Sequence, residues 1–340
     1  MNKEFKAIID GLKESKETPL HKNSRILLID SLNTFLRSFV MIHHLNPQGN
    51  HIGGLTGYLK SIGFAIRHIK PTRVILVFDG HGGSTNKRYL YPEYKANRKI
   101  NKISNWDGFD SQADESASIT DQLVRLVDYL KCLPVDMLSI DKIEADDVIA
   151  HISNTTGDSV HIMSSDRDYL QLVSDRVTVY SPVKKKFYTP KAVLDEYGIP
   201  ANNFLTQKIL LGDNSDNVPG VQGLGVKTML KLYPALKEPE TLHIEQILEH
   251  AEKEQGKYKK IHDFRQQLAI NKQLMNLHEV NIPEEDLIRI QHVIDNPNMT
   301  VDKATFMKYY AEDYLGNSIP NVATWFYDTF QYLTGFKLAV

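Results

Sequence analysis

The sequence predicts an α/β fold with a mostly parallel sheet that helices cover on both faces, followed by a mainly helical region. Three observations lead to this expectation. Short apolar runs that end in aspartate recur in the first half of the chain, as at residues 25–30 and 73–79. Segments with helical spacing of apolar residues separate such runs, and this alternation favours a parallel sheet. After about residue 189 the strand pattern gives way to helical patterns.

The first half of the chain is expected to alternate between buried strands and amphipathic helices. Strands of a parallel sheet are buried on both faces and therefore read as continuous apolar runs, whereas helices place apolar residues three and four positions apart. We expect strands at residues 25–30, 73–79, 134–140, 159–163 and 177–181. We expect helices at about residues 34–45, 55–70, 119–133, 144–152 and, as a short element, 168–173.

Residues 80–117 interrupt this alternation with a segment that lacks a clean period and is rich in Gly, Asn and Ser. A long irregular insertion in a compact domain is usually functional or disordered. Between Ser84 and Ser104, six basic residues stand against Glu93, a local charge of +5: Lys87, Arg88, Lys95, Arg98, Lys99 and Lys102. Tyr89, Tyr91 and Tyr94 are interleaved with them. Cations and rings together are typical of a groove for single-stranded nucleic acid; a solvated surface loop is the alternative.

The second half of the chain is expected to contain short helices at residues 190–197 and 203–211, a glycine-rich segment at 212–233 and further helices to about 277. The segment from Gly220 to Thr228 ends in Lys-Thr like a P-loop, but Val226 occupies the position of the required glycine and no apolar strand precedes it. A tight turn between two helices is favoured instead. Its backbone N–H groups can meet a phosphate at the start of the next helix, and a purely structural turn is the alternative.

Composition limits the class of protein. The chain has 340 residues, 41% of them hydrophobic and 24% charged, as in an ordinary globular protein. The single cysteine, Cys132, excludes intramolecular disulfides and sites with several cysteine ligands, and it fits a reducing compartment. Residues 1–22 are polar and lack the apolar stretch of a signal peptide, and no run is long enough for a membrane span. We therefore expect a cytoplasmic protein without membrane partners.

Acidic residues recur at predicted strand ends and helix starts: Asp30, Asp79, Glu144, Asp146, Asp147, Asp166, Asp168, Asp213 and Asp216. The carboxyl ends of parallel strands share one edge, where open α/β sheets place their sites. Two like charges ~4 Å apart at an effective dielectric near 20 repel by about 4 kcal/mol, so the cluster requires cations. Oxygen ligands in this number suit Mg²⁺ or Mn²⁺, and two such ions commonly serve phosphodiester hydrolysis. Singly, each residue has a simpler explanation as a helix cap or first-turn acid.

In this order the residues resemble the flap endonuclease/5′-3′ exonuclease family, and among its members the phage enzymes of the T-even ribonuclease H type. The likeness extends over about residues 25–280. Its motifs are Asp30, Asp79, Tyr94-Lys-Ala-Asn-Arg98, Glu144-Ala-Asp-Asp147, Ser165-Asp-Arg-Asp168, Gly212-Asp-Asn-Ser-Asp-Asn217 and Gly220-Val-Gln-Gly-Leu-Gly-Val-Lys-Thr228. Several motifs in the family's order are more specific than any one of them.

The resemblance implies an N-terminal extension (1–22), a PIN-like nuclease domain (23–188) with an arch insertion at about 80–117, and a helical region (189–340). That region would hold a helix–three-turn–helix at about 203–234 and an aromatic tail: Trp325, Phe326, Tyr327, Phe330, Tyr332 and Phe336. The tail would either pack as a helix, which we favour, or dock a replication partner such as a sliding clamp or a single-strand-binding protein. The implied protein is a monomer, in the host bacterial cytoplasm if phage-encoded.

The implied activity is that of a metal-dependent 5′-3′ exonuclease/flap endonuclease that acts on DNA flaps or RNA–DNA duplexes, with ribonuclease H-like removal of RNA primers in replication. By position, Asp30, Asp79, Glu144 and Asp146 would surround one Mg²⁺. Asp147, Asp166, Asp168, Asp213 and Asp216 would surround the second, with Mn²⁺ as a substitute. The alternatives are a structure-specific DNA-binding protein without nuclease activity and, less favoured, an NTPase.

The resemblance also assigns the residues that contact nucleic acid. Lys95 and Arg98 would steady the scissile phosphate, as cationic clamps do, and Tyr94 would stack on the terminal base. Arg37, Lys87 and Arg88 are expected to contact nucleic acid. The duplex-binding turn would consist of Gly220, Gly223, Gly225, Lys227 and Thr228, with K⁺ on its backbone carbonyls.

Overall fold

A six-stranded sheet forms the centre of the structure, a computed structural model that describes residues 23–98, 108–156 and 159–333. The strand order is β3-β2-β1-β4-β5-β6. The strands are β1 (Arg25–Asp30), β2 (Arg73–Asp79), β3 (Asp136–Ile140), β4 (Ser159–Met163), β5 (Val177–Ser181) and β6 (Lys186–Tyr188). The first five run parallel, and β6 is antiparallel to β5. The mostly parallel sheet and its five predicted strands are confirmed, and β6 is an addition.

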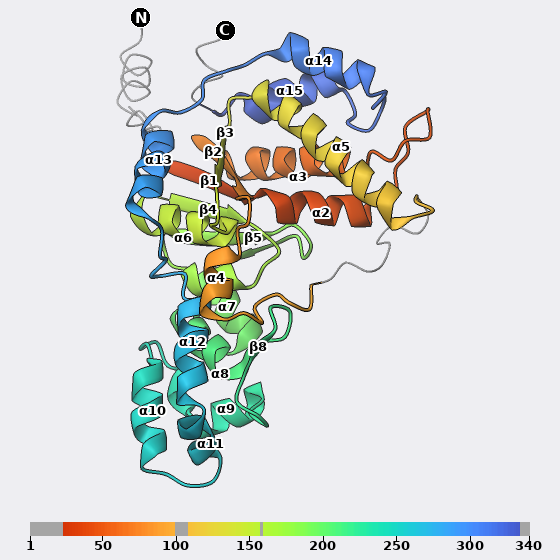
Figure 1. The fold of residues 1–340 in the computed structure, drawn as a ribbon. Helices are drawn as coiled ribbons and strands as arrows, with labels where there is room; N and C mark the ends of the chain where they lie inside the picture. Colours follow the sequence, from red (N-terminus) through yellow and green to blue (C-terminus); the bar gives the residue numbers. More distant parts are fainter. Residues whose placement is uncertain (1–22, 99–107, 157–158, 334–340) are drawn as a thin grey trace, which may run out of the picture.

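Helices cover both faces of the sheet (Figure 1). On one face, α2 (Ser31–Met41), α3 (Gly53–Ile69) and α5 (Gln112–Lys131) pack with Leu27 and Ile29 of β1 in one apolar cluster. On the other, α6 (Ala145–Thr155) and the 3-10 helix η1 (Asp168–Leu172) pack with Ile26 and Leu28. Side chains alternate along a strand, so a continuous apolar run supplies both clusters.

The insertion is more ordered than its sequence predicts. It contains a short helix, α4 (Thr85–Leu90), and α5 begins at Gln112, well before the expected start at residue 119. Ser111 caps α5, because its side chain accepts a hydrogen bond from the Asp114 backbone N–H at 3.1 Å. The expectation of an irregular segment up to residue 117 is therefore wrong. Both stretches are largely exposed, so they lack the apolar stripe by which a helix is recognised.

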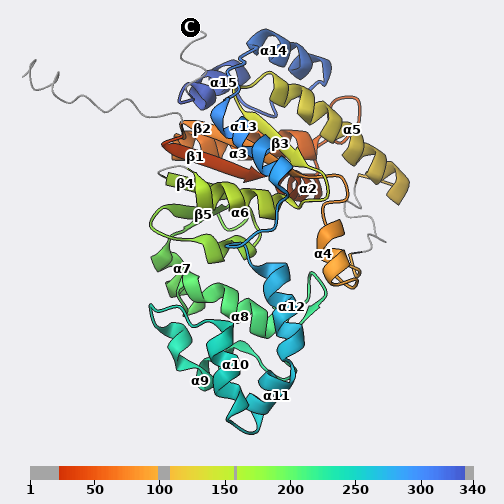
Figure 2. The ribbon, with the colours of Figure 1, turned by 60° about the vertical axis from the view of Figure 1, so that its left-hand side comes forward.

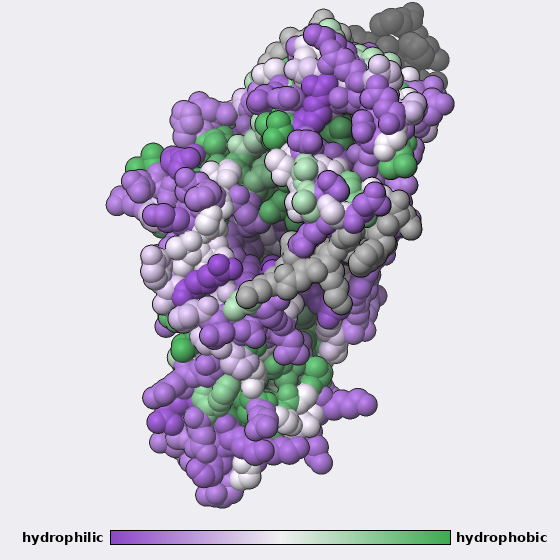
Figure 3. All heavy atoms as spheres, turned by 45° about the vertical axis from the view of Figure 1, so that its right-hand side comes forward, coloured by the Kyte–Doolittle hydropathy of each residue, from purple (hydrophilic) through white to green (hydrophobic). Residues whose placement is uncertain are grey.

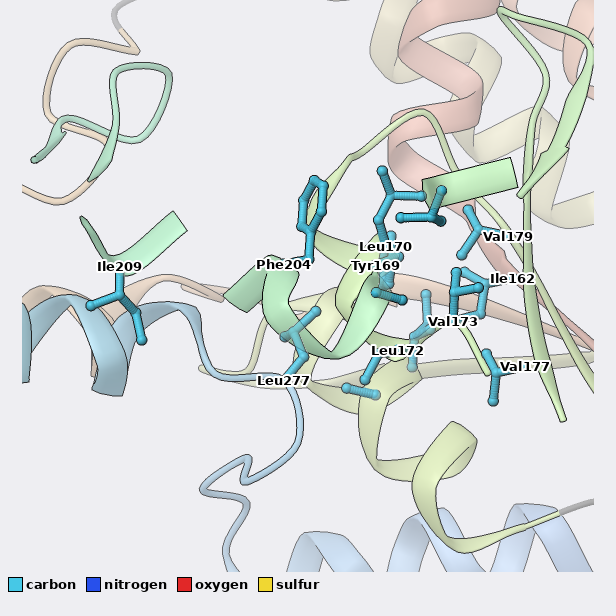
Figure 4. Packing of buried hydrophobic residues seen from close by; sticks show 14 of the residues in the cluster. Ile162, Tyr169, Leu170, Leu172, Val173, Val177, Val179, Phe204, Ile209 and Leu277 are labelled. Atoms are coloured by element: carbon cyan, nitrogen blue, oxygen red, sulfur yellow. The ribbon is translucent and has the colours of Figure 1, made fainter. Parts of the chain in front are cut away.

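The helical region continues the core below the sheet (Figures 1 and 2). Its elements are α7 (Pro190–Tyr197), η2 (Ala201–Asn203), α8 (Phe204–Leu211), α9 (Val226–Leu232), η3 (Pro234–Lys237), α10 (Ile244–Glu252), α11 (Lys257–Asp263) and α12 (Arg265–Met275). A two-stranded hairpin, β7 (Gly212–Asp213) with β8 (Val218–Pro219), leads from α8 towards α9. Figure 4 shows Tyr169 and Leu170 of η1 and Phe204 of α8 in the same apolar cluster.

Three C-terminal helices return to the α/β part: α13 (Glu284–Asp295), α14 (Lys303–Glu312) and α15 (Val322–Phe330) (Figure 1). Buried Arg73 of β2 holds α13, because its guanidinium pairs with Asp136 at 2.8 Å and donates to backbone carbonyls at the end of α13. Phe326 and Phe330 of α15 are fully buried in the cluster that includes α3. These tail residues pack, as favoured from the sequence.

Some predicted features lie outside the described residues: the N-terminal extension 1–22, Lys99 and Lys102 of the insertion, and Phe336 of the tail. Across the described ranges, none of the helices combines the length and the apolar character that crossing a bilayer demands. The face displayed in Figure 3 is mostly hydrophilic, and apolar side chains reach it only in limited patches.

Candidate active site

The carboxyl ends of the central strands carry the first acidic residues. Asp30 ends β1 and caps α2, accepting from the Asn33 backbone N–H at 3.3 Å. The Ser164 hydroxyl donates to its other oxygen at 2.9 Å, and the Tyr169 hydroxyl at 3.4 Å. Burial, reinforced by the charge of Asp79, raises the pKa of Asp30 to about 7. Asp30 therefore has both a capping role and a place in the acidic site.

Asp79 connects the sheet edge to α6. Its carboxylate accepts a hydrogen bond from the Ala145 backbone N–H at 2.9 Å, which fixes the start of the helix beside β2. Glu144, Asp146 and Asp147 consequently face the site, and one carboxylate oxygen from each lies within 4.8 Å of the others. Close hard oxygen donors of this kind match the ligands that Mg²⁺ and Mn²⁺ prefer. The donor set therefore fits a divalent metal ion.

Lys87 of α4 neutralises this acidic triad. Its Nζ lies 2.9 Å from Glu144, 3.3 Å from Asp146 and 3.1 Å from Asp147. Burial opposes ionisation of Glu144, but Lys87 and Lys95 outweigh it and lower its pKa to about 2. For Asp146, burial and the neighbouring carboxylates prevail over Lys87 and raise the pKa to about 7. The triad thus holds one firmly ionised carboxylate and others that retain protons more readily.

A second acidic pair is bridged by Lys208 of α8. Its ammonium pairs with Asp168 at the start of η1 and, at 3.0 Å, with Asp213 of the hairpin. Burial raises the pKa of Asp168 to about 6 despite this attraction. For Asp213 the cation and the Ser215 hydrogen bonds outweigh burial and lower the pKa to about 2. Exposed Asp166 accepts from the Asp168 backbone N–H at 2.9 Å and adds to the repulsion that both Asp30 and Asp168 experience.

The base of the insertion is anchored to the hairpin. Lys95 adopts a left-handed backbone conformation, with φ of 56°, and its N–H donates to the Asp216 carbonyl at 2.8 Å. The Lys95 ammonium pairs with Glu144, and the Arg98 guanidinium pairs with Asp216. Such backbone strain persists only where the surroundings hold it and is common at functional sites. The two predicted catalytic cations therefore lie at the acidic site, each on a carboxylate.

Two residues predicted to contact nucleic acid differ from expectation. Tyr94 was expected to stack on a base, but its ring is only 3% exposed and packs beside Val218. Its hydroxyl donates to Glu144 at 3.0 Å and Asp216 at 3.2 Å, so in this structure the ring faces the interior and is not presented to a base. Lys87, 12% exposed at its side chain, is committed to carboxylates and not presented to a phosphate.

The other predicted nucleic-acid residues are more accessible. Arg37 and Arg88 are exposed, and the Nε of Arg88 donates to the Tyr94 carbonyl at 3.3 Å. Lys227 at the start of α9 is exposed, and Thr228 is partly exposed. Arg37 lines one cavity together with Asp166, Asp168 and Asp213.

The three glycines predicted to form the turn differ in how strictly the structure requires glycine at their positions. A Cβ on Gly220 would lie 2.0 Å from the Leu211 carbonyl oxygen, so the hairpin itself requires glycine there. Gly223 has a φ of +78°, a conformation that L side chains rarely adopt. A Cβ on Gly225 would meet no described atom within 4 Å.

Sequence reasoning missed three residues that hold the site: Ser164, Tyr169 and Lys208. Lys208 left one signal, because it directly precedes the apolar run 209–211 at the end of α8 and stands five residues before Asp213. Divalent metal ions were the cations expected among these carboxylates, and in the fold Lys87, Lys95, Arg98 and Lys208 already pair with them. Ser164 and Tyr169 left no signal of their own.

Two family models match this chain, one over the α/β part and one over the helical region that follows it. The profile of the 5′-3′ exonuclease N-terminal resolvase-like domain matches residues 25–198, and that of the 5′-3′ exonuclease C-terminal SAM fold matches residues 199–292. A 5′-3′ exonuclease of Bacillus subtilis is 29% identical over 268 residues, which cover 75% of this chain and 84% of the relative. DNA polymerase I of the same organism is 27% identical over 75% of this chain, but the match spans only 28% of that longer protein.

Solved structures share the fold. The T5 D15 protein co-crystallised with metal ions aligns with a TM-score of 0.62 at 17% identity, covering 85% of this chain and 98% of that one. A pseudo-enzyme-product complex of bacteriophage T5 D15 flap endonuclease with DNA and metal ions aligns with a TM-score of 0.60 at 17% identity, covering 85% and 97%. At this identity the likeness concerns the fold.

Proposed function

The chain belongs to the 5′-3′ exonuclease family and is a nuclease that hydrolyses phosphodiester bonds, and on this premise we propose that it is a metal-dependent 5′ nuclease acting on flap and duplex ends. The observation that carries the proposal is the pair of acidic groups at one sheet edge, each gathered around a lysine. So many carboxylates would repel a polyanionic substrate unless divalent ions were bound among them.

Glu144, Asp146 and Asp147, with Asp30 and Asp79 beside them, are proposed to hold one divalent ion. Asp168 and Asp213, with Asp166 and Asp216 beside them, are proposed to hold the second. Bound there, two such ions would supply Lewis acidity and a reactive water at neutral pH. We propose Mg²⁺ as the ion used, with Mn²⁺ as a substitute.

The chain's own cations are proposed to position the substrate. Lys95 and Arg98 form ion pairs with carboxylates of the site. Each could exchange its carboxylate partner for a phosphate oxygen of the substrate. Exposed Arg37 and Arg88 would contact the phosphate backbone outside the site, and the turn from Gly220 to Thr228 would contact the duplex, with K⁺ on its carbonyls. Phosphate contacts of this kind fix register and orientation but read no sequence.

The biological setting is part of the proposal. Ribonuclease H-like removal of RNA primers, a role in DNA replication and a phage origin follow from the resemblance stated above, as do a monomeric state, a cytoplasmic location, and contact with a sliding clamp or single-strand-binding protein.

The test is incubation with a 5′-labelled flap duplex whose 5′ strand is DNA or RNA, in Mg²⁺, Ca²⁺ or EDTA. We expect release of short 5′ products only with Mg²⁺, and the preferred strand identifies the task. Asp146→Asn is expected to lower single-turnover cleavage by at least about a thousandfold, about 4 kcal/mol of activation free energy, while binding changes little. Asp195→Asn, at an exposed residue of α7, is the matched control. Binding without cleavage under every metal would favour the DNA-binding alternative.

A further inference from the structure

We propose that the exposed side of α3, together with β5 and β6 at one end of the sheet, is a docking surface for an acidic segment of a partner protein. That segment would carry at least one aromatic or long aliphatic side chain. Such docking is separate from the proposed nuclease function and does not depend on it. Two features of the surface point to this partner: a cluster of aromatic rings that is open on one side, and an excess of positive charge around the rings.

Four aromatic rings meet where α3 lies over the last two strands. Phe64 and His68 are four residues apart on one face of α3, and Tyr180 of β5 lies opposite Phe187 of β6. Phe64 is stacked on His68 and on Tyr180, with ring centroids 5.7 Å apart in both pairs. His68 is also stacked on Phe187, at 5.0 Å, and Tyr180 and Phe187 close the cluster at 4.6 Å. Each ring therefore has two ring neighbours.

The outer side of this ring cluster is open. Tyr180 is only 4% exposed, but Phe64 is 46% exposed. His68 is exposed and Phe187 is partly exposed. Single exposed apolar residues are normal on a protein surface, whereas apolar side chains that form a contiguous patch indicate an interaction site. Stacking holds these rings in place before a partner arrives, so little conformational entropy is lost on binding.

The chain segments that build the ring cluster contain no acidic residue. Residues 60–70 and 177–188 lack Asp and Glu and carry six cationic side chains: Lys60, Arg67, Lys70, Lys184, Lys185 and Lys186. Some of these charges are already in use, since Lys184 and Lys186 pair with Glu196. Lys60 and Lys185 are exposed and form no ion pair with any described residue. Lys60 stands four residues before Phe64 on α3, so its ammonium borders the open rings.

An acidic protein segment matches both features. Its carboxylates would complement the unpaired ammonium groups, which orients a partner and speeds its encounter. Its aromatic or aliphatic side chain would pack on Phe64, as buried anchors do at the centres of protein interfaces.

A nucleic-acid strand fits this surface less well. It would satisfy the charges, but its bases need open ring faces on which to stack, and the four rings are stacked on one another without a gap between them. The surface also extends away from the acidic site. α3 ends at Ile69, shortly before β2 begins at Arg73, so His68 lies towards the amino ends of the strands. The carboxylates lie at the carboxyl ends.

The test is fluorescence anisotropy of labelled peptides with blocked ends, titrated with the full-length protein in EDTA. One peptide is rich in aspartate and contains one phenylalanine and one leucine; the second has serine in place of these two apolar residues. We expect the first to bind at least about tenfold more tightly than the second, and its affinity to fall as salt is added.

Two variants test the two features separately. Phe64→Ala removes the most exposed ring and Lys60→Glu reverses the bordering charge, and each is expected to weaken binding of the apolar-containing peptide at least about fivefold. Flap cleavage by either variant is expected to equal that of the unaltered protein, which also shows that the variants fold. The matched controls are Tyr314→Ala, at a ring that is 50% exposed after α14, and Lys303→Glu, at an exposed residue of α14.

Several outcomes would overturn the docking surface. The acidic peptide could fail to bind, bind equally well without its apolar residues, or bind both variants as tightly as the unaltered protein. A single-stranded oligothymidylate could bind more tightly than the peptide and lose affinity in Phe64→Ala, which would assign the surface to nucleic acid. Self-association that disappears in Phe64→Ala would assign it to a second copy of the chain. Peptide binding that requires removal of residues 334–340 would assign it to the chain's own tail.

Discussion

Replacing Lys208 by methionine is expected to destabilise the metal-free protein, and to do so more strongly as pH rises. Lys208 is only 8% exposed, and its ammonium is shared by Asp168 and Asp213. Methionine keeps the length and the apolar stem but removes the charge, so two partly buried carboxylates lose their common cation. Breaking a buried ion pair from one side typically costs about 3–5 kcal/mol.

Protonation of Asp168 limits this cost and makes it depend on pH. Burial already raises the pKa of Asp168 to about 6, and without Lys208 it rises further. A carboxyl with a raised pKa keeps its proton when folded and releases it when unfolded, so stability falls with pH until the folded-state pKa is passed. For the unaltered protein that fall ends near pH 6. In the variant it continues at about 1.4 kcal/mol per pH unit, adding about 3 kcal/mol by pH 8.

Urea denaturation in EDTA at pH 6, 7 and 8 measures the difference. Lys186→Met is the control, because Lys186 pairs with Glu196 on the surface, and such pairs contribute less than about 1 kcal/mol. A loss in Lys208→Met that is equal at pH 6 and pH 8 would refute the reasoning, since it would show that Asp168 does not depend on Lys208 for its ionisation.

Further predictions concern protons, backbone and buried charge. Ca²⁺ binding at pH 7 is expected to release protons from Asp30 and Asp146, because each has a pKa of about 7. The binding enthalpy measured by calorimetry should therefore vary with the ionisation enthalpy of the buffer. Identical binding enthalpies in all buffers would contradict this. Gly220→Ala is expected to lower the free energy of unfolding by about 3 kcal/mol, because the added Cβ has no room. Gly225→Ala is expected to lower it by less than about 1 kcal/mol, and thermal unfolding of both variants measures the difference. Arg73→Leu is expected to cost about 3–5 kcal/mol in urea denaturation, and a loss below about 1 kcal/mol would rule out its anchoring of α13.

The strands could be predicted because burial on both faces leaves an unbroken apolar run, and the run at residues 25–30 ends at Asp30 in both sequence and structure. Short exposed helices such as α4 could not be predicted, because they bury no residue and so show no apolar residues at helical spacing. β6 was missed for a related reason: it has three residues and begins on the last of three consecutive lysines, so its pairing with β5 depends on the fold rather than on local pattern.

The carboxylates of the site and two of its cations, Lys95 and Arg98, could be predicted from the sequence, but the pairing of cations with carboxylates could not. Asp and Glu stand at strand ends and helix starts, positions that sequence pattern locates. The pairing of Lys208 depends on how closely α8 approaches η1, which no local pattern contains. Tyr94 shows a further limit, because a tyrosine among basic residues has the same sequence appearance whether its ring faces a base or, as here, the core.

Repulsion among nine carboxylates indicates from the sequence that cations must neutralise them, and divalent ions are the cations expected there. The fold contains another answer, since Lys87, Lys95, Arg98 and Lys208 each pair with one or more of these groups. Metal ions therefore do not meet a bare acidic site. In the proposed mechanism a divalent ion would compete with ammonium and guanidinium groups for the same oxygens, and the cations that it displaced would become free to bind phosphate.

This competition is testable at Lys87, whose Nζ lies within 3.3 Å of Glu144, Asp146 and Asp147. Lys87→Met is expected to lower the stability of the metal-free protein yet to tighten Ca²⁺ binding about tenfold, or about 1.4 kcal/mol, because no ammonium has to be displaced. The Ca²⁺ dependence of the unfolding temperature measures both effects, with Lys60→Met at an exposed residue of α3 as control. Unchanged or weaker Ca²⁺ binding would show that Lys87 organises the carboxylates for the metal instead of competing with it.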